Sequence, residues 1–269
     1  MLQEKSRKKD SRKPDASHSS KCILITGGTD GIGLALARRL QKDGHRVLIT
    51  GRDLTRLQSA IQHCPGLEGL RSDVTLKSDR QELKAYIQRH FGKLDVLVNN
   101  AGIGNGYYFL GTGGEELFER EIQTNLISPA LLIHEMMPLL SRPADIVNVT
   151  SGYALWPGPC LPGYSASKAG LSAFTSVLQE QLRLNREDIH VMEVCPPMVD
   201  TTMTQEVNCF KISTEEVADQ IASALARRPR RLLIGLCKVL DISRRLFPNL
   251  TRWVIRRWPI PLHTLPSKP

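Results

Sequence analysis

The sequence predicts one doubly wound α/β domain built on a seven-stranded parallel sheet, and three observations lead to this expectation. Short apolar runs alternate with amphipathic segments from residue 21 to residue 235. Runs such as residues 95–98 lack the polar–apolar alternation of half-exposed strands, which is typical of strands buried on both faces. Because right-handed crossovers lay helices against the sheet, this alternation predicts helices on both faces.

The first unit has the clearest pattern. Residues 22–26 form an apolar, β-branched run that ends in glycines, and residues 32–43 carry apolar side chains at helical spacing before Gly44. This predicts a strand, a turn and a helix, and the pattern then recurs. Further strands are predicted at 47–50, near Leu70, and at 94–98, 146–150, 189–194 and 231–234, with helices at 54–62, 77–91, 115–140, 164–184 and 214–227.

A proline-containing loop at residues 195–213 connects the sixth predicted strand to the next helix. In open parallel sheets, ligands bind outside the carboxyl ends of the strands. We therefore expect a mobile loop over the binding edge of a Rossmann-type sheet.

The charge is unevenly distributed along the chain. Of 269 residues, 41% are hydrophobic and 23% charged, with a net charge of +9, which suits a globular domain rather than a disordered chain. Residues 1–21 carry +4 and residues 227–269 carry +10, which leaves the middle mildly acidic. A nucleic-acid-binding domain would carry its basic groups on the folded surface, so nucleic acid is not expected as a partner. We expect a disordered basic arm at 1–20, a main domain at 21–235 and an amphipathic extension at 236–269.

The chain shows no pattern for membrane insertion or export. No uncharged apolar run approaches the roughly 18 to 20 residues that a spanning helix needs, and no apolar core follows the basic N-terminal residues. A cytoplasmic location is expected. The six cysteines form no C-x-x-C pair, so we expect reduced thiols and no metal site.

A glycine-rich turn joins the first predicted strand to the first predicted helix. Glycines there permit unusual φ angles and close approach of a pyrophosphate, and the helix N-terminus offers unpaired N–H groups. The spacing is longer than G-x-G-x-x-G, but the position directly after the first strand indicates a dinucleotide site. The cofactor-binding candidates in this turn are Gly27, Gly28, Thr29, Asp30, Gly31, Ile32 and Gly33.

The end of the second strand predicts which dinucleotide is bound. An acid beside the adenosine ribose favours NAD(H), whereas an arginine favours the 2′-phosphate of NADP(H). Gly51 stands where the acid is expected and Arg52 follows it, so NADP(H) is favoured over NAD(H). The alternative is that Asp53 binds the ribose and Arg52 is only a solvated charge.

Five motifs in this order make the chain resemble the short-chain dehydrogenase/reductase family, from about residue 21 to residue 234. They are the glycine turn, Asn99-Asn100-Ala101-Gly102 after the fourth strand, Asn125 in the following helix, Ser151 after the fifth strand, and Tyr164-(x)3-Lys168. A Pro196-Pro197 pair replaces the Pro-Gly that is common in the family, and resembles a DltE-like subgroup.

The chemistry of these residues can also be reasoned directly. Reducing a carbonyl requires a proton donor, and a tyrosine with a pKa near 10 is a poor one unless a cation lowers that pKa. Tyr164 and Lys168 lie one helical turn apart, so Lys168 is expected to stabilise the phenolate. Ser151 is expected to hold the substrate oxygen. The resemblance further implies that Asn125 anchors a water that relays protons to Lys168.

The resemblance also implies further cofactor contacts. Asp73 and Val74 would flank the adenine, Asn100, Ala101 and Gly102 would line the cofactor, and Val199 and Thr201 would contact the carboxamide. Two departures from the family pattern affect this expectation. Pro197 lacks a backbone N–H donor, and Asp30 stands where many NADP-preferring relatives carry a basic residue.

An uncharged, proline-rich loop at residues 152–163 lies next to the predicted chemistry. Its candidate substrate-contacting residues are Tyr153, Leu155, Trp156 and Leu161. They suit an apolar ketone or alcohol better than a sugar or an acid. The alternative is that they pack against a lid or a subunit partner.

The C-terminal extension is amphipathic. Leu236, Val239, Leu240, Leu246 and Phe247 form an apolar stripe, interrupted by Pro248 and continued by Leu250, Trp253, Val254 and Trp258, with arginines and Lys238 alongside. A lid or interface helix is favoured over peripheral contact with a membrane.

These observations predict an NADP(H)-dependent oxidoreductase that acts on an apolar carbonyl or secondary alcohol. The resemblance implies a homo-oligomer, formed through the helices at 115–140 and 164–184. Two alternatives remain open: an NADP(H)-binding sensor or scaffold without turnover, and a membrane-docking interaction protein that works through the C-terminal extension.

Overall fold

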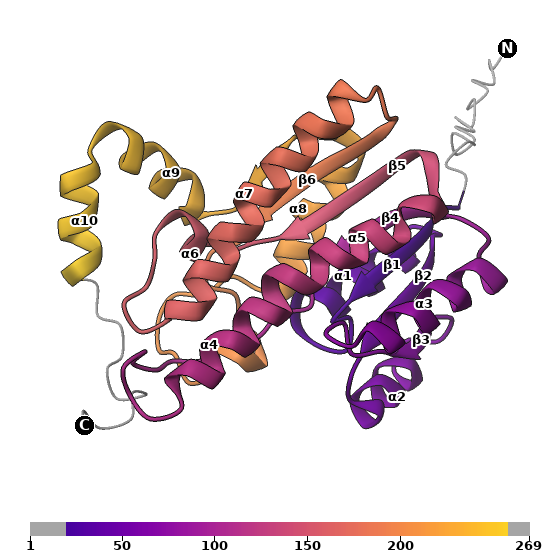
Figure 1. The fold of residues 1–269 in the computed structure, drawn as a ribbon, viewed down its shortest axis with the longest axis horizontal. Coiled ribbons are helices and arrows are strands. Elements are labelled where there is room, and N and C mark those ends of the chain that lie inside the picture. The colour runs from indigo at the N-terminus through magenta and orange to yellow at the C-terminus, as the bar shows by residue number, and fades with distance from the viewer. Residues whose placement is uncertain (1–19, 258–269) are drawn as a thin grey trace, which may run out of the picture.

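The computed structural model describes residues 20–257, and Figure 1 shows how their helices surround a central sheet. The sheet has seven strands, all paired in parallel, in the order β3-β2-β1-β4-β5-β6-β7. The predicted fold class is therefore confirmed. The strands are β1 (Cys22–Thr26), β2 (Arg46–Gly51), β3 (Glu68–Arg71), β4 (Leu94–Asn99), β5 (Leu140–Val149), β6 (Ile189–Cys195) and β7 (Arg231–Leu233).

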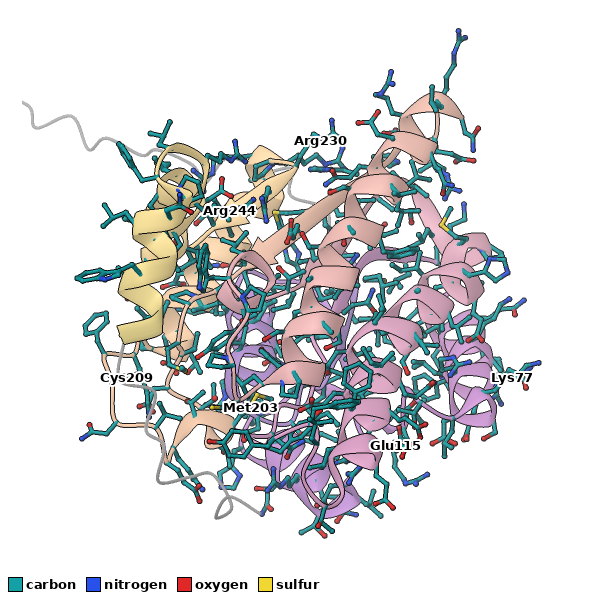
Figure 2. The ribbon with its side chains drawn as sticks, turned by 60° about the vertical axis from the view of Figure 1, so that its left-hand side comes forward. Lys77, Glu115, Met203, Cys209, Arg230 and Arg244 are labelled. Carbon is teal, nitrogen blue, oxygen red and sulfur yellow. The ribbon has the colours of Figure 1, made fainter. Side chains whose placement is uncertain are left out.

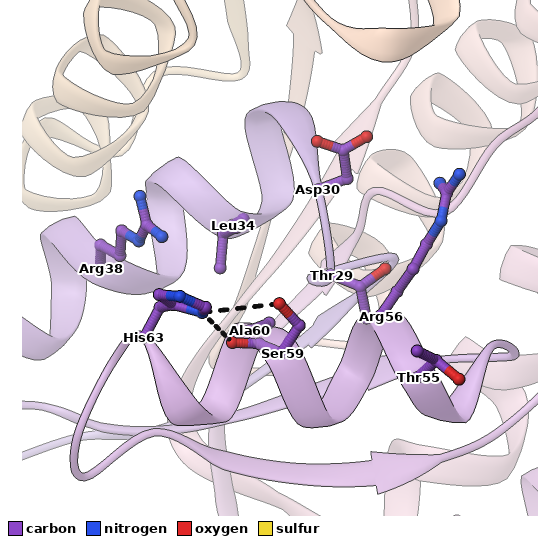
Figure 3. A pocket seen from close by; sticks show the side chains of 9 residues that line it. All are labelled: Thr29, Asp30, Leu34, Arg38, Thr55, Arg56, Ser59, Ala60 and His63. Atoms are coloured by element: carbon purple, nitrogen blue, oxygen red, sulfur yellow. Dashed lines mark hydrogen bonds between the residues drawn. The ribbon is translucent and has the colours of Figure 1, made fainter.

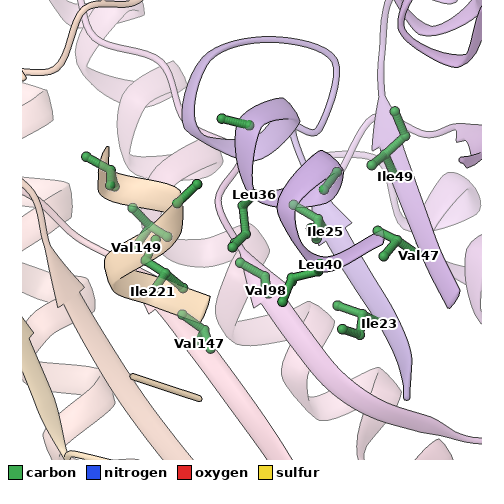
Figure 4. Packing of buried hydrophobic residues seen from close by; sticks show 14 of the residues in the cluster. Ile23, Ile25, Leu36, Leu40, Val47, Ile49, Val98, Val147, Val149 and Ile221 are labelled. Atoms are coloured by element: carbon green, nitrogen blue, oxygen red, sulfur yellow. The ribbon is translucent and has the colours of Figure 1, made fainter. Parts of the chain in front are cut away.

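Helices cover both faces of the sheet. On one face, α1 (Gly31–Lys42), α2 (Leu54–Gln62) and α8 (Thr214–Arg227) bury side chains such as Leu36 and Ile221 against the strands (Figure 4). On the other face lie α3 (Lys77–His90), α5 (Ser128–Met136) and α7 (Pro162–Leu184). Each fully buried Leu or Ile side chain contributes about 1.5–3 kcal/mol, so these two clusters hold the sheet rigid beneath the site.

The order of the strands determines where a ligand can enter. β1 pairs with β2 on one side and with β4 on the other, so the direction of chain progression reverses at β1 and β4. Connections after these two strands run to opposite faces and leave a crevice at the carboxyl ends. The glycine turn after β1 and the Asn99-Asn100-Ala101-Gly102 segment after β4 both lie at this reversal.

The predicted helix at 115–140 is wrong in its extent. This segment comprises α4 (Gly114–Ile122), a π-helical stretch (Gln123–Ile127), α5 and a 3₁₀ turn (Met137–Leu139), after which β5 begins. Pro138 lies in the 3₁₀ turn, and proline cannot continue the hydrogen bonding of an α-helix. β5 also starts earlier than predicted, because residues 141–143 (Ser, Arg and Pro) are partly or fully exposed and do not form an apolar run.

The segments around the crevice contain two short helices that the pattern did not predict. α6 (Gly152–Leu155) follows β5 directly, and a 3₁₀ turn (Thr202–Thr204) lies in the predicted loop at 195–213. A bridge between Val199 and Ile212 ties the two arms of that loop together.

The C-terminal extension forms α9 (Leu236–Leu246) and α10 (Pro248–Arg257), which lie beyond α6 at one end of the molecule (Figure 1). The helices meet at the predicted interruption, where α9 ends at Leu246 and Pro248 begins α10. The predicted arm at 1–20 lies outside the described residues apart from Ser20, as do the last twelve positions, including Trp258. No helix within residues 20–257 is both long and apolar enough to cross a bilayer.

Candidate active site

The carboxyl ends of the strands bring together three of the residues expected to carry the chemistry. Ser151 follows β5, Tyr164 lies in the first turn of α7, and Lys168 lies one turn further along that helix. Lys168 Nζ is 5.8 Å from the centroid of the Tyr164 ring. The Ser151 side chain lies close enough to the Tyr164 hydroxyl to favour its phenolate form. The three polar groups therefore meet at one point of the crevice.

The surroundings hold these side chains in place. Lys168 is 4% exposed and its Nζ donates to the carbonyl oxygen of Val149 over 2.8 Å. The Tyr153 ring meets the Tyr164 ring edge-on, with 6.1 Å between the centroids. A Cβ at Gly104 would lie 2.9 Å from Tyr164 Cδ2, so only glycine lets the chain pass this closely over the ring.

Burial shifts the pKa values of Tyr164 and Lys168 in opposite directions. It raises the pKa of Tyr164 to about 12, against the effect of the Ser151 side chain, and it lowers the pKa of Lys168 from 10.5 to about 8. The expected lowering of the Tyr164 pKa is therefore not found, because burial disfavours the phenolate more than its neighbours favour it. At neutral pH the phenol keeps its proton while the lysine is still largely an ammonium.

Asn125 lies in the π-helical stretch and is fully buried. Its Oδ1 accepts from the backbone N–H of Ile103 over 2.9 Å, and its Nδ2 donates to the Ile103 carbonyl over 2.8 Å and to Ser167 Oγ over 3.0 Å. A Cβ at Gly102 would lie 3.2 Å from Asn125 Oδ1 and 3.4 Å from Lys168 Nζ. Asn125 thus fixes the chain after β4 directly beside Lys168.

The glycine turn has the geometry of a cradle. Gly27 and Gly31 have φ angles of 63° and 54°, which other residues rarely adopt. A Cβ at Gly33 would lie 2.4 Å from Asn100 Nδ2, and this amide donates to the carbonyls of Thr26 and Gly27, both over 3.0 Å. The turn therefore places backbone without side chains at the N-terminus of α1. The unpaired N–H groups there are suited to bind a pyrophosphate.

Not every residue of the turn faces the crevice. A Cβ at Gly28 would lie 2.5 Å from Ile49 Cγ2, and Ile32 packs against the core, so these two residues serve the packing of α1 on the sheet. Asp30 accepts from the N–H of Gly31 over 2.7 Å and from Thr202 Oγ1 over 2.5 Å. Asp30 therefore ties the turn to the loop after β6.

The other expected cofactor contacts lie around the same edge. Thr26 Oγ1 accepts from the N–H groups of Asn100 and Ala101, both over 3.1 Å. Thr201 lies beside the turn, since a Cβ at Gly31 would be 3.1 Å from Thr201 Cγ2. Val199 is buried in its bridge to Ile212.

Asp73 and Val74 follow β3, and both are engaged within their own turn. Asp73 Oδ1 accepts from the N–H and hydroxyl groups of Thr75, and the Val74 carbonyl accepts from Arg80.

The two candidate residues after β2 make different contacts. Asp53 is the N-cap of α2, and its Oδ1 accepts from the N–H of Arg56 over 3.0 Å. A Cβ at Gly51 would lie 2.5 Å from Thr29 Cγ2, so a carboxylate side chain has no room there. Arg52 is exposed. Asp53 therefore caps α2, and both its side chain and that of Arg52 are exposed.

A pocket of about 380 Å³ lies between α1 and α2, beside Thr29 and Asp30 (Figure 3). Two arginines that sequence reasoning did not select, Arg38 and Arg56, line it. Arg56 follows Arg52 at a spacing of four residues, which is the signal that could have identified it. Arg38 and Arg56 therefore add positive charge close to Arg52 at the end of β2.

The predicted substrate loop divides into buried and accessible parts. Leu155 is 6% exposed and packs with Cys195 and Cys237, so it belongs to a small core under α9. Tyr153, Trp156 and Leu161 are half-buried. Tyr153 also touches the Tyr164 ring, so it is the member of this set with a contact to the candidate catalytic residues.

Glu121 is a fully buried residue that sequence reasoning missed. Its Oε1 accepts from the N–H of Asn105 over 2.7 Å and its Oε2 accepts from the Tyr107 hydroxyl over 3.1 Å, and a Cβ at Gly163 would lie 2.5 Å from Oε2. Glu121 of α4 thus lies against the first turn of α7. Burial raises the pKa of Glu121. The spacing of four residues between Glu121 and Asn125 could have indicated that they share a helix face.

Comparisons with known proteins agree with this geometry. A family model described as short chain dehydrogenase matches residues 21–211. The uncharacterised oxidoreductase DltE of Bacillus subtilis is 43% identical over 188 residues, which cover 68% of this chain and 73% of that protein. A putative ketoacyl reductase of the granaticin polyketide synthase of Streptomyces violaceoruber is 35% identical over 217 residues, which cover 74% of this chain and 77% of that protein.

Solved structures share the fold. A short chain dehydrogenase from Burkholderia cenocepacia in complex with NADP superposes with a TM-score of 0.79 at 23% identity, covering 88% of this chain and 97% of that one. The match to the family model spans most of the chain, and the predicted likeness to DltE is confirmed. This chain therefore belongs to the short-chain dehydrogenase/reductase family of oxidoreductases.

Proposed function

We propose that this protein is an NADP(H)-dependent oxidoreductase that interconverts an apolar carbonyl compound and the corresponding secondary alcohol. The observation that carries the proposal is the meeting of Ser151, Tyr164 and Lys168 at one point of the crevice, on the same strand edge as the glycine turn. The nicotinamide cofactor supplies or accepts the hydride. The chain's own groups bind the reactants and move the proton.

In the reducing direction, Tyr164 is the general acid. Its raised pKa of about 12 keeps the hydroxyl protonated at neutral pH, so a proton is available for the alkoxide that forms as the carbonyl carbon accepts hydride. Ser151 donates a hydrogen bond to the same oxygen and aligns it with Tyr164. The ammonium of Lys168 stabilises the phenolate that remains, because its pKa of about 8 leaves it largely charged at pH 7.

Proton resupply is assigned to Asn125 and Lys168. The Asn125 amide accepts from the N–H of Ile103 and donates to the Ile103 carbonyl, so it fixes this backbone segment next to Lys168. This rigid edge is suited to hold a water that returns a proton through Lys168 to Tyr164.

The residues after β2 support NADP(H) over NAD(H). Arg52 is open to solvent and can bind a phosphate with two parallel N–H donors, whereas the Asp53 carboxylate already caps α2. Arg56 in the adjoining pocket supplies further positive charge. Asp30 stands where many NADP-preferring relatives carry a basic residue. In this chain its carboxylate accepts a hydrogen bond from Thr202.

The uncharged loop at 152–163 supports an apolar substrate. Its aromatic members Tyr153 and Trp156 are half-buried, and Tyr153 packs directly on Tyr164. A charged substrate would lose its hydration beside this loop without gaining a counter-ion from it.

The test is oxidation of NADPH with a panel of ketones that includes medium-chain 2-alkanones and, for comparison, charged 2-keto acids. We expect turnover of the alkanones, and we expect Tyr164→Phe to reduce it by about 10²–10⁴-fold, the usual contribution of a general acid. Tyr86→Phe is the matched control, because Tyr86 lies on α3 against His90 and Phe91.

Two results would refute the proposal. NADPH binding without consumption of any ketone would favour the sensor or scaffold alternative. Full activity of Tyr164→Phe would mean that another group carries the proton.

A further inference from the structure

The outer side of α9 and α10 presents a continuous row of large apolar side chains. Each is between 49% and 65% exposed. We call this row the C-terminal apolar stripe; it consists of Leu236, Val239, Ile242, Leu246, Phe247, Leu250 and Trp253. Leu240, which the sequence pattern placed in the stripe, is instead half-buried, and Ile242 takes its place. Val254 lies among the side chains that the structure does not describe.

The inner side of the same helices is anchored to the domain. Cys237 is fully buried beside Leu155, and Asp241 is 6% exposed. Asp241 forms ion pairs with Arg231 of β7 at 3.6 Å and with Arg244 and Arg245 at 2.9 Å. These contacts, one of them from Arg244 (labelled in Figure 2), fix the rotation of α9 and leave the stripe exposed.

Positive charge accompanies the stripe. Lys238 and Arg245 are exposed and lie seven residues apart, so they share one flank of α9 next to Val239, Ile242 and Leu246. Residues 227–269 contain eleven basic residues, and their one acid is the buried Asp241. An apolar row with a basic flank is the pattern of a helix that lies in the headgroup region of an anionic membrane.

The charge and exposure distinguish this partner from two others. A lid that closes on the domain would bury its apolar face, whereas the stripe faces away from the domain. A two-fold contact through this side of α9 would bury the flanking Lys238 and Arg245 in an interface where α9 offers no exposed acid to neutralise them. Anionic lipid headgroups supply the negative charge that a second copy lacks.

We propose that the C-terminal apolar stripe docks this protein on an anionic lipid surface. The apolar side chains enter the headgroup region, while Lys238 and Arg245 bind the lipid phosphates. α9 packs on α6, which directly follows Ser151, so docking would hold the side of the crevice with the substrate loop near the membrane. This inference goes beyond the proposed reaction and does not depend on it.

The experiment is co-sedimentation of the full chain with vesicles of phosphatidylcholine alone and of phosphatidylcholine with phosphatidylserine. We expect binding to the anionic vesicles that weakens with added salt, and little binding to the neutral ones. The double variant Val239→Glu/Ile242→Glu should lose about tenfold or more in affinity, since it places charge in the headgroup region. Leu76→Glu, at a 48% exposed position just before α3, is the matched control and should bind like the wild type.

The substituted side chains are exposed, so each variant should keep the far-ultraviolet spectrum and melting temperature of the wild type. Unchanged vesicle binding by the double variant would overturn the proposal. So would a concentration-dependent dimer in sedimentation equilibrium that the double variant abolishes, because the stripe would then be a subunit interface. Vesicle binding with an oligomeric mass that the substitutions leave unchanged supports lipid docking.

Discussion

Replacing Lys168 with methionine tests the physical basis of the site without a substrate. The ammonium of Lys168 is almost fully buried, and burial lowers its pKa from 10.5 to about 8. Since each pKa unit corresponds to about 1.4 kcal/mol, keeping this group charged costs the folded protein about 3 kcal/mol at neutral pH. Methionine is also unbranched and fills a similar space without a charge.

The net effect includes the hydrogen bond that is lost. Lys168→Met leaves the Val149 carbonyl, now 2.8 Å from Nζ, without this donor, which costs about 1 kcal/mol. The variant should therefore be more stable by about 2 kcal/mol at pH 7, which corresponds to a rise in melting temperature of about 4–8 °C for a domain of this size. The same variant should lose most of its catalytic activity.

The pH dependence gives the sharpest signature. Between pH 8 and pH 10.5 the unfolded chain still binds the lysine proton that the folded chain has released, so the wild type becomes relatively more stable as the pH rises. The stability advantage of the variant should be full below pH 8, should reach zero near pH 10, and should become a deficit of about 1 kcal/mol at higher pH, where only the lost hydrogen bond counts.

The assay is thermal unfolding followed by circular dichroism at pH 7 and at pH 10, for cofactor-free protein. The exposed Lys93 gives the control substitution Lys93→Met, which should show no such pH-dependent gain. Two results would contradict this: a variant less stable than wild type at pH 7, or a stability difference that is the same at both pH values. Either would show that burial of the charged Lys168 does not lower the free energy of unfolding.

Two further predictions concern Glu121 and Arg52. Glu121→Ala should destabilise the fold by about 3 kcal/mol or more, because the Tyr107 hydroxyl and the N–H of Asn105 lose their buried acceptor; urea unfolding measures this, and a loss below about 1 kcal/mol would contradict it. Arg52→Ala should weaken NADPH binding by about 10–100-fold through loss of a charge-assisted contact and leave NADH binding unchanged. Fluorescence titration of the wild type and the variant with NADPH and NADH measures the dissociation constants. An equal loss of affinity for the two cofactors would argue against a 2′-phosphate contact.

The sequence by itself determined the sheet, the glycine turn and the order of the motifs. The run at 22–26 is apolar and β-branched, and Gly27 and Gly31 stand where positive φ angles occur, so these features depend on neighbouring residues in the chain. The same applies to Tyr164 and Lys168, whose spacing of one helical turn places them together wherever α7 packs. Patterns failed where the local signal was weak, as in the polar start of β5 and the division of the helix at 115–140.

Only the tertiary structure decided the electrostatics and the partners of the site. Burial, rather than the nearby lysine, sets the pKa of Tyr164, and it depends on segments as distant as Gly104 and Tyr153. Glu121 reaches the first turn of α7 from another helix, and the outward orientation of Val239 depends on ion pairs between α9 and β7. Solvent exposure and long-range contacts arise from how elements pack against each other, and no stretch of neighbouring residues encodes that information.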